Sequence, residues 1–120
     1  MRATLLCMGL AVLAAGCATL DRQPLAFSEL AYAGADGAAW AARALPLPAL
    51  QAAEGLATPL TMHAVEAGPA EGPPVVLLHD VGGYASVWRA QIASLAGAGQ
   101  RVIALDLIGH GKSSKPGAFS

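Results

Sequence analysis

Two short apolar runs with a helical pattern between them constrain the fold of this chain more than any other feature. Residues 75–78 and 101–105 have the length and composition of buried strands. A strand, a helix and a second strand within about 30 residues form a βαβ unit, which implies parallel strands and a right-handed crossover. Because 75–78 is wholly apolar, we expect cover on both of its faces. The helical pattern consists of Trp88, Ile92 and Leu95, with Ser86 as candidate N-cap and Gly97 or Gly99 as the stop.

A further strand is predicted upstream of this unit. Apolar and polar side chains alternate over residues 60–65, before a turn at Gly68 and Pro69, which predicts a half-buried antiparallel strand. The alanine-rich stretch 18–57 contains several breakers, and a short helix is expected over 38–45. No chemical motif is found in this lead-in. Its larger apolar side chains, expected to cover a sheet edge, are Leu25, Phe27, Leu30, Tyr32 and Trp40.

The first residues have the form of a targeting segment. A basic start precedes an almost unbroken apolar stretch, shorter than the roughly 20 residues of a spanning helix, that ends in small residues and Cys17. This ending resembles the lipobox of bacterial lipoproteins, although Ala14 stands where leucine is more usual. The resemblance implies a signal peptide over 1–16, a lipid on Cys17 and, because Ala18 follows instead of aspartate, an outer-membrane location facing the periplasm. The alternatives are ordinary cleavage, giving a secreted or periplasmic protein, and an uncleaved anchor.

Charge and cysteine usage exclude several classes of function. The net charge is -1 and only 12% of residues are charged, so no basic surface for nucleic acid is expected. Without a run of like charge, an electrostatic attachment to anionic lipid is also not expected. Both cysteines lie within residues 1–17, so a disulfide framework and a thiolate metal site are excluded for the rest of the chain.

In open α/β sheets the chemistry gathers at the carboxyl ends of the strands, here the loops 79–86 and 106–114. A phosphate-binding loop fails there because Asp106 stands where its first glycine should be. The dinucleotide pattern G-x-G-x-x-G fails at Ser114, and the nucleophile elbow G-x-S-x-G fails at Lys115. No catalytic triad can therefore be assigned. We interpret His63 as a partly exposed strand residue and His110 as a turn residue.

The stretches 61–68, 73–83 and 101–113, with Trp88 between the last two, together resemble the start of the α/β-hydrolase fold. The resemblance covers about residues 50–118 and has two parts, a His-Gly-type loop and a D-x-x-G-x-G-x-S loop, in the family's order. It implies an α/β fold, namely the N-terminal portion of an α/β-hydrolase sheet with antiparallel strands followed by a βαβ unit. The expected domains are a signal peptide over 1–16, a lipid-anchored tether and lead-in over 17–57, and the hydrolase part over 58–120.

The resemblance also implies roles for the two loops. The backbone N–H of Val81 would be one donor of an oxyanion hole. Asp80 stands where the family usually has glycine; we expect its carboxylate to point away and bond the loop, the alternative being that it weakens activity. The remaining implied residues are His79, Gly82 and Gly83 in the active-site loop, and Asp106, Gly109, Gly111 and Ser113 in a structural loop motif.

The two loops indicate different subfamilies. The run His79 to Gly83 resembles the H-G-x-G-G loop of esterases and carbon–carbon bond hydrolases, so a serine-type ester hydrolase is our first hypothesis. The stretches 62–74 and 106–117 resemble haloalkane dehalogenases and epoxide hydrolases, which use an aspartate nucleophile. Against this alternative, Val81 stands where dehalogenases usually have Asn or Glu, and Gly82 where epoxide hydrolases usually have proline.

The resemblance places the nucleophile, the acid and the catalytic histidine after residue 120. We therefore expect the 120-residue chain to be a truncated, unstable and inactive part of a longer hydrolase. Its substrate would be a small ester-like molecule, and no cofactor or metal is implied, because histidine activates the nucleophile in this family. A hypothesis of another class is a non-enzymatic, membrane-anchored lipoprotein that uses the partial fold for binding.

Overall fold

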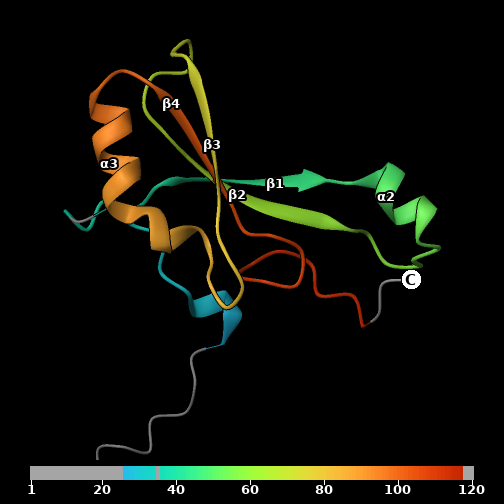
Figure 1. Cartoon of the computed structure of the whole chain (residues 1–120). Coiled ribbons are helices and arrows are strands. Elements are labelled where there is room, and N and C mark those ends of the chain that lie inside the picture. Colours follow the sequence, from blue (N-terminus) through green and yellow to red (C-terminus); the bar gives the residue numbers. More distant parts are fainter. Residues whose placement is uncertain (1–25, 35, 118–120) are drawn as a thin grey trace, which may run out of the picture.

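The computed structural model describes residues 26–34 and 36–117 (Figure 1). The described part is a four-stranded sheet with the helix α3 packed against it and with two loops at one end of the parallel strands. In chain order its elements are the 3-10 turn η1 (Phe27–Glu29), β1 (Ala41–Pro46), α2 (Pro48–Ala53), β2 (Thr61–Ala67), β3 (Pro74–Leu78), the 3-10 turn η2 (Ala85–Trp88), α3 (Arg89–Gly97) and β4 (Arg101–Leu105).

The strand order in the sheet is β1-β2-β4-β3. Strands β1 and β2 are antiparallel, as are β2 and β4, whereas β3 and β4 are parallel. Since parallel neighbours cannot be joined by a tight turn, the chain crosses from β3 to β4 through η2 and α3. The predicted antiparallel strand and βαβ unit are therefore confirmed, and β3 is an outer strand of the described sheet.

The hydrophobic core lies between α3 and one face of the sheet. Ile92 of α3 is buried against β-strand side chains of the same cluster, among them Val65, Val102 and Ala104. Each aliphatic side chain of this size that leaves water contributes about 1.5–3 kcal/mol, so this small cluster is the main apolar support of the fold. From the lead-in, Leu30, Tyr32 and Trp40 pack against it as expected, whereas Phe27 remains 56% exposed and Leu25 lies outside the described residues.

The helix predicted over 38–45 is wrong, because residues 41–46 form β1. Alanine favours helices, but here the whole segment pairs with β2, from Ala41 opposite Glu66 to Pro46 opposite Thr61. Tertiary pairing therefore overrides the local propensity. The helix of this region is α2, which begins one residue after Leu47 with Pro48 at its first position, where a missing N–H costs nothing.

Ser86 is not the N-cap of the crossover helix. The 3-10 turn η2 leads directly into α3 at Arg89, and the Ser86 hydroxyl instead donates to the carbonyl of Ala31, 2.9 Å away. The predicted stop is confirmed, since α3 ends at Gly97 and Gly99 follows with a φ of 83°.

Strand β3 is covered on one face only in the described part of the chain, contrary to the expectation of cover on both. Leu77 packs against the core, but Val76 and Leu78 are 56% and 55% exposed. The reason is topological, because the core cluster, to which η2 and α3 contribute, lies on one face of the sheet, and β4 borders one edge of this outer strand. Strand β2 is more buried than the predicted half-buried strand. Its neighbouring residues Ala64 and Val65 are both buried, so the centre of the strand is covered on both faces.

The predicted signal peptide 1–16 and the lipidation site Cys17 lie outside the described residues. Among residues 26–34 and 36–117, no helix has the length and apolar character needed to cross a membrane.

Candidate functional site

The loops 79–86 and 106–114 meet at the carboxyl ends of β3 and β4 (Figure 1). Asp106 joins them, because its fully buried carboxylate accepts a hydrogen bond from a backbone N–H of each loop. The N–H of Ala85 lies 2.7 Å from Oδ1, and the N–H of Lys112 lies 2.9 Å from Oδ2. The two loops therefore share one anionic anchor.

Two side chains complete what we call the Asp106 cluster, which consists of Asp106, Tyr32, His63 and the backbone N–H groups of Ala85 and Lys112. The Tyr32 hydroxyl donates to Oδ2 of Asp106, and Nδ1 of His63 lies 3.0 Å from the same oxygen. Four donors thus surround a carboxylate from which water is excluded, which is the condition under which a buried charge is tolerated.

The Tyr32 hydroxyl stays a donor over the whole working pH range. Burial raises the pKa of this phenol well above its usual value, and the hydrogen bond and charge of Asp106 raise it further. The Tyr32 ring also meets His63 and Tyr84 edge-on, with centroid separations of 4.6 and 5.3 Å. A residue of the lead-in is therefore in contact with both β2 and the 79–86 loop.

His79 forms a second link between the loops. Its ring is buried, and Nε2 accepts a hydrogen bond from the N–H of Leu107 at 2.9 Å. Because Nε2 is an acceptor, the proton of the neutral ring is on Nδ1, which donates to the carbonyl of Asp80 at 2.8 Å. Both ring nitrogens are occupied, so this histidine has no free nitrogen for proton transfer.

Asp80 turns its carboxylate onto the loop itself. The N–H of Val81 donates to Oδ1 of Asp80 at 2.6 Å, and the Val81 residue is 89% exposed. The carboxylate thus bonds the loop, as expected, but the expectation that it points away is wrong, because it occupies the N–H to which the resemblance assigns the oxyanion-hole role. That role of Val81 stays a prediction. Gly82, with a φ of 79°, and Gly83 complete the turn, closed by a bond from the Gly83 N–H to the Asp80 carbonyl at 3.1 Å.

The D-x-x-G-x-G-x-S loop is bonded to β2. The Ser113 hydroxyl accepts from the N–H of His63 at 2.8 Å and donates to the carbonyl of Asp106. Within the loop the N–H of Gly109 bonds the Ser114 carbonyl at 2.9 Å, while Gly111 is buried against the Asp106 carboxylate. These contacts give the predicted structural motif a physical basis, although its role in a reaction stays a prediction.

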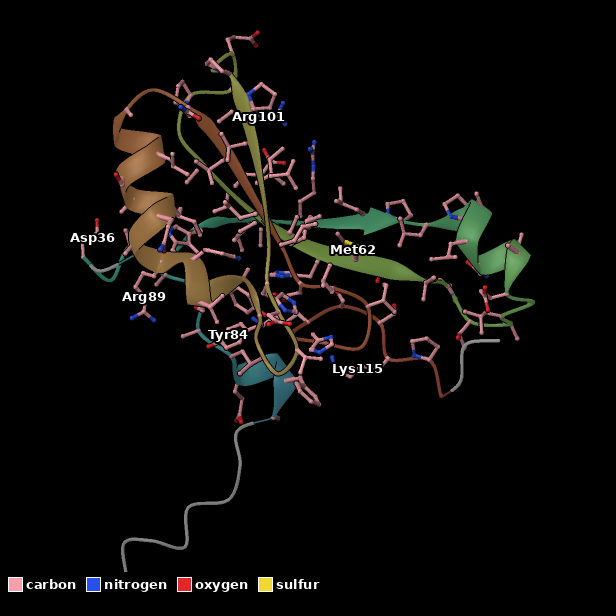
Figure 2. All side chains as sticks on the ribbon, in the orientation of Figure 1. Asp36, Met62, Tyr84, Arg89, Arg101 and Lys115 are labelled. Carbon is pink, nitrogen blue, oxygen red and sulfur yellow. The ribbon has the colours of Figure 1, made fainter. Side chains whose placement is uncertain are left out.

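The structure brings the sequence-predicted loop residues together at the carboxyl ends of β3 and β4. Figure 2 labels Tyr84 of the 79–86 loop and Lys115, which follows the 106–114 loop. His110 lies in a turn, as interpreted, with its ring 5.0 Å from that of His79. His63 is a partly exposed residue of strand β2, also as interpreted, and its side chain is bonded to Asp106. Sequence reasoning placed Tyr32 only as an apolar cover and missed its bond to Asp106. No local pattern could have indicated it, because the two residues lie 74 positions apart. Among the described residues, no group of His, Cys, Asp and Glu could hold a metal ion.

Comparison with known proteins finds one superfamily. A family model for the alpha/beta hydrolase fold matches residues 73–119. A haloalkane dehalogenase of Mycobacterium marinum is 51% identical over 57 residues, covering 48% of this chain and 19% of the relative. Epoxide hydrolase B of Mycobacterium tuberculosis is 52% identical over 56 residues, covering 45% and 16% respectively. The crystal structure of epoxide hydrolase A from Mycobacterium thermoresistibile aligns with a TM-score of 0.54 and 34% identity over 66% of this chain and 22% of that protein.

The mixed sheet and these similarities show that the chain carries the N-terminal part of an α/β-hydrolase sheet. The predicted fold class is therefore confirmed, and the family model and the relatives support the predicted superfamily. The chain spans 19% of the length of the haloalkane dehalogenase and 16% of the length of the epoxide hydrolase.

Proposed function

We propose that the whole protein is an α/β-hydrolase with an aspartate nucleophile that acts on a small haloalkane or epoxide. The observation that carries this proposal is the 51% identity over 57 residues with a haloalkane dehalogenase, together with 52% over 56 residues with an epoxide hydrolase. The aspartate-nucleophile hydrolase, which was the alternative hypothesis from the sequence, is therefore preferred to the serine-type ester hydrolase. Identity over the part of the chain that carries both loops outweighs the departures at Val81 and Gly82.

In the proposed reaction, residues 79–114 supply the loop that carries one oxyanion-hole donor and the side chains that hold this loop in place. An aspartate after residue 120 attacks a substrate carbon and forms an ester, while the carbon–halogen bond breaks and halide leaves, or the epoxide carbon–oxygen bond breaks and its oxygen takes a proton from a donor of the site. Water that gives its proton to a histidine then attacks the ester carbonyl, and the oxyanion that forms there needs N–H donors. The ester carbon–oxygen bond then breaks, which releases the alcohol or diol and restores the aspartate. Val81 would offer one of the N–H donors, held in place by the bonds of His79 and the Asp106 cluster.

A serine-type ester hydrolase is the second candidate. The consecutive glycines after Val81 favour it, because Gly82 takes a left-handed φ of 79° where epoxide hydrolases usually have proline. Gly82 and Gly83 beside the Val81 N–H carry no side chains that would block the carbonyl oxygen of an ester, which would replace the Asp80 carboxylate as the acceptor of this N–H.

The decisive experiment is a turnover assay of the whole protein with bromobutane, styrene oxide and p-nitrophenyl butyrate. A single turnover in heavy-oxygen water then identifies the nucleophile. With an aspartate nucleophile the label enters the enzyme, whereas with a serine nucleophile it enters the acid product. Absence of turnover with all three substrates would contradict both candidates and favour an anchored binding element.

Changing Asp80 tests whether its carboxylate limits the oxyanion hole. In the whole protein, Asp80→Gly frees the Val81 N–H, and one such donor is worth roughly 10²–10³ in rate, so turnover should stay equal or rise by up to about a hundredfold. Asp80→Asn is the matched variant, since its amide oxygen can keep the hydrogen bond without the charge. Initial rates decide: a collapse of turnover in a folded Asp80→Gly protein would mean that the carboxylate acts positively.

We further propose that Cys17 carries a lipid that anchors the protein in the cell envelope, in the outer membrane facing the periplasm. Cells grown with radioactive palmitate should label the wild-type protein, because lipoprotein processing attaches acyl chains at this cysteine. The Cys17→Ser variant should carry no label and leave the membrane fraction. Cys7→Ser is the control and should label normally; label that persists in Cys17→Ser would refute the anchor.

A further inference from the structure

We infer that Tyr32 is a positioning residue for the candidate oxyanion loop, so the segment before β1 is a working part of the site and more than a tether. This inference rests on the proposed function, since it concerns the loop that carries the Val81 N–H. It follows from contacts of the lead-in with both loops at the carboxyl ends of β3 and β4.

The first contact is the bond from the Tyr32 hydroxyl to Asp106. Oδ2 of Asp106, which accepts this bond, also accepts the N–H of Lys112, and Oδ1 accepts the N–H of Ala85. Any rotation of the carboxylate moves both loops together, because each is bonded to one of its oxygens. The Tyr32 hydroxyl and His63 are the two side-chain donors that fix this rotation.

The second contact is made directly with the 79–86 loop. The Tyr32 ring meets Tyr84 edge-on at 5.3 Å, and the hydroxyl of Ser86 donates to the carbonyl of Ala31 at 2.9 Å. Tyr84, labelled in Figure 2, lies on the 79–86 loop, next to Ala85, where the 3-10 turn η2 begins. Ala31 and Tyr32 of the lead-in thus contact the C-terminal half of the 79–86 loop. The N-terminal half of the same loop contains Val81.

The third contact is made with the 106–114 loop and the residue after it. The ammonium group of Lys112 lies 4.9 Å from the centre of the Tyr32 ring, and that of Lys115 lies 4.0 Å from the centre of the Phe27 ring. Lys115 also donates to the carbonyls of Gly111 and Ser113, at 2.6 and 3.0 Å. The cation thereby links η1 to the loop that contains the D-x-x-G-x-G-x-S motif.

The test is Tyr32→Phe in the whole protein, which removes one hydroxyl and keeps the ring. Loss of the hydroxyl lets the Asp106 carboxylate turn, and small misplacements of a catalytic loop reach about 10²-fold in rate, so kcat should fall about fivefold to fiftyfold with KM within twofold. Backbone hydrogen exchange of Ala85 and Lys112 should accelerate at least tenfold. Exchange at Ile103 of β4, which pairs with Glu66 of β2 and Val76 of β3, should stay unchanged. The matched control is Ser94→Ala, which removes an exposed hydroxyl of α3.

Each outcome decides the inference. An unchanged kcat, or exchange at Ala85 and Lys112 equal to the wild type, would overturn it. Faster exchange spread evenly over β4 would also overturn it, since that result means a general loss of stability. If the wild type turns over none of the three substrates, the proposed function fails, and the exchange of Ala85 and Lys112 alone decides whether Tyr32 holds the two loops.

Discussion

The Asp106→Asn variant of the whole protein is expected to lose about 3–5 kcal/mol of the free energy of unfolding, as when one partner of a buried charged group is removed. Asparagine has nearly the same shape, but its amide nitrogen must face one or more of the donors that now face carboxylate oxygens. If the amide nitrogen takes the place of Oδ1, it opposes the N–H of Ala85. If it takes the place of Oδ2, it opposes Lys112 and the side chains of Tyr32 and His63. Each buried donor left without an acceptor costs about 1–3 kcal/mol.

Urea unfolding of the variant and the wild type measures this loss. The control is Asp36→Asn, because Asp36 is exposed and, among the residues that the structure describes, its side chain accepts one hydrogen bond, from the N–H of Ala38 at 3.1 Å. That change should cost less than about 1 kcal/mol, since water replaces the lost interaction. If Asp106→Asn costs no more than its control, the cluster does not stabilise the fold as argued.

The sheet could be predicted where its signal is local. Residues 101–105 form β4 of the parallel pair, and this could be predicted because the apolar run and the helical pattern before it lie within about 20 consecutive residues. The same kind of local signal failed for residues 41–46, whose alanines favour a helix but pair with β2, about twenty residues downstream. Cover over Val76 and Leu78 could not be predicted from their apolar character alone, since it depends on which elements lie across that face.

In the candidate site too, features with a local sequence signal could be predicted, whereas long-range contacts could not. The resemblance drew attention to Asp106 and His79, whose hydrogen bonds connect the two loops. The bond of Tyr32 to Asp106 carries no sequence signal, because the donor lies in an alanine-rich lead-in and its acceptor is 74 positions away. The sequence led us to expect that the Asp80 carboxylate points away from the candidate oxyanion hole, and this expectation is wrong. Only the turn geometry places the carboxylate on the N–H of Val81.

The Gly111→Ala variant is expected to lose about 2–5 kcal/mol of the free energy of unfolding, because two penalties act at this position. The backbone has a φ of 49°, and a left-handed conformation costs a residue with a Cβ about 1–2 kcal/mol. The new Cβ would also collide with the Asp106 carboxylate. That carboxylate cannot move aside without releasing Tyr32, His63 and the two loop N–H groups, so we expect a further cost of about 1–3 kcal/mol, as for an overpacked core.

Gly109→Ala separates the two penalties. Gly109 has a φ of 87°, but a Cβ built there meets no atom within 4 Å, so its cost should be the backbone penalty of about 1–2 kcal/mol. Urea unfolding should therefore rank Gly111→Ala below Gly109→Ala in stability, by at least about 1 kcal/mol. Gly111→Ala should also speed backbone exchange at Ala85, on the other loop, because the displaced carboxylate releases both loops at once. Equal stabilities, or an effect confined to residues 106–114, would mean that Asp106 does not couple the two loops.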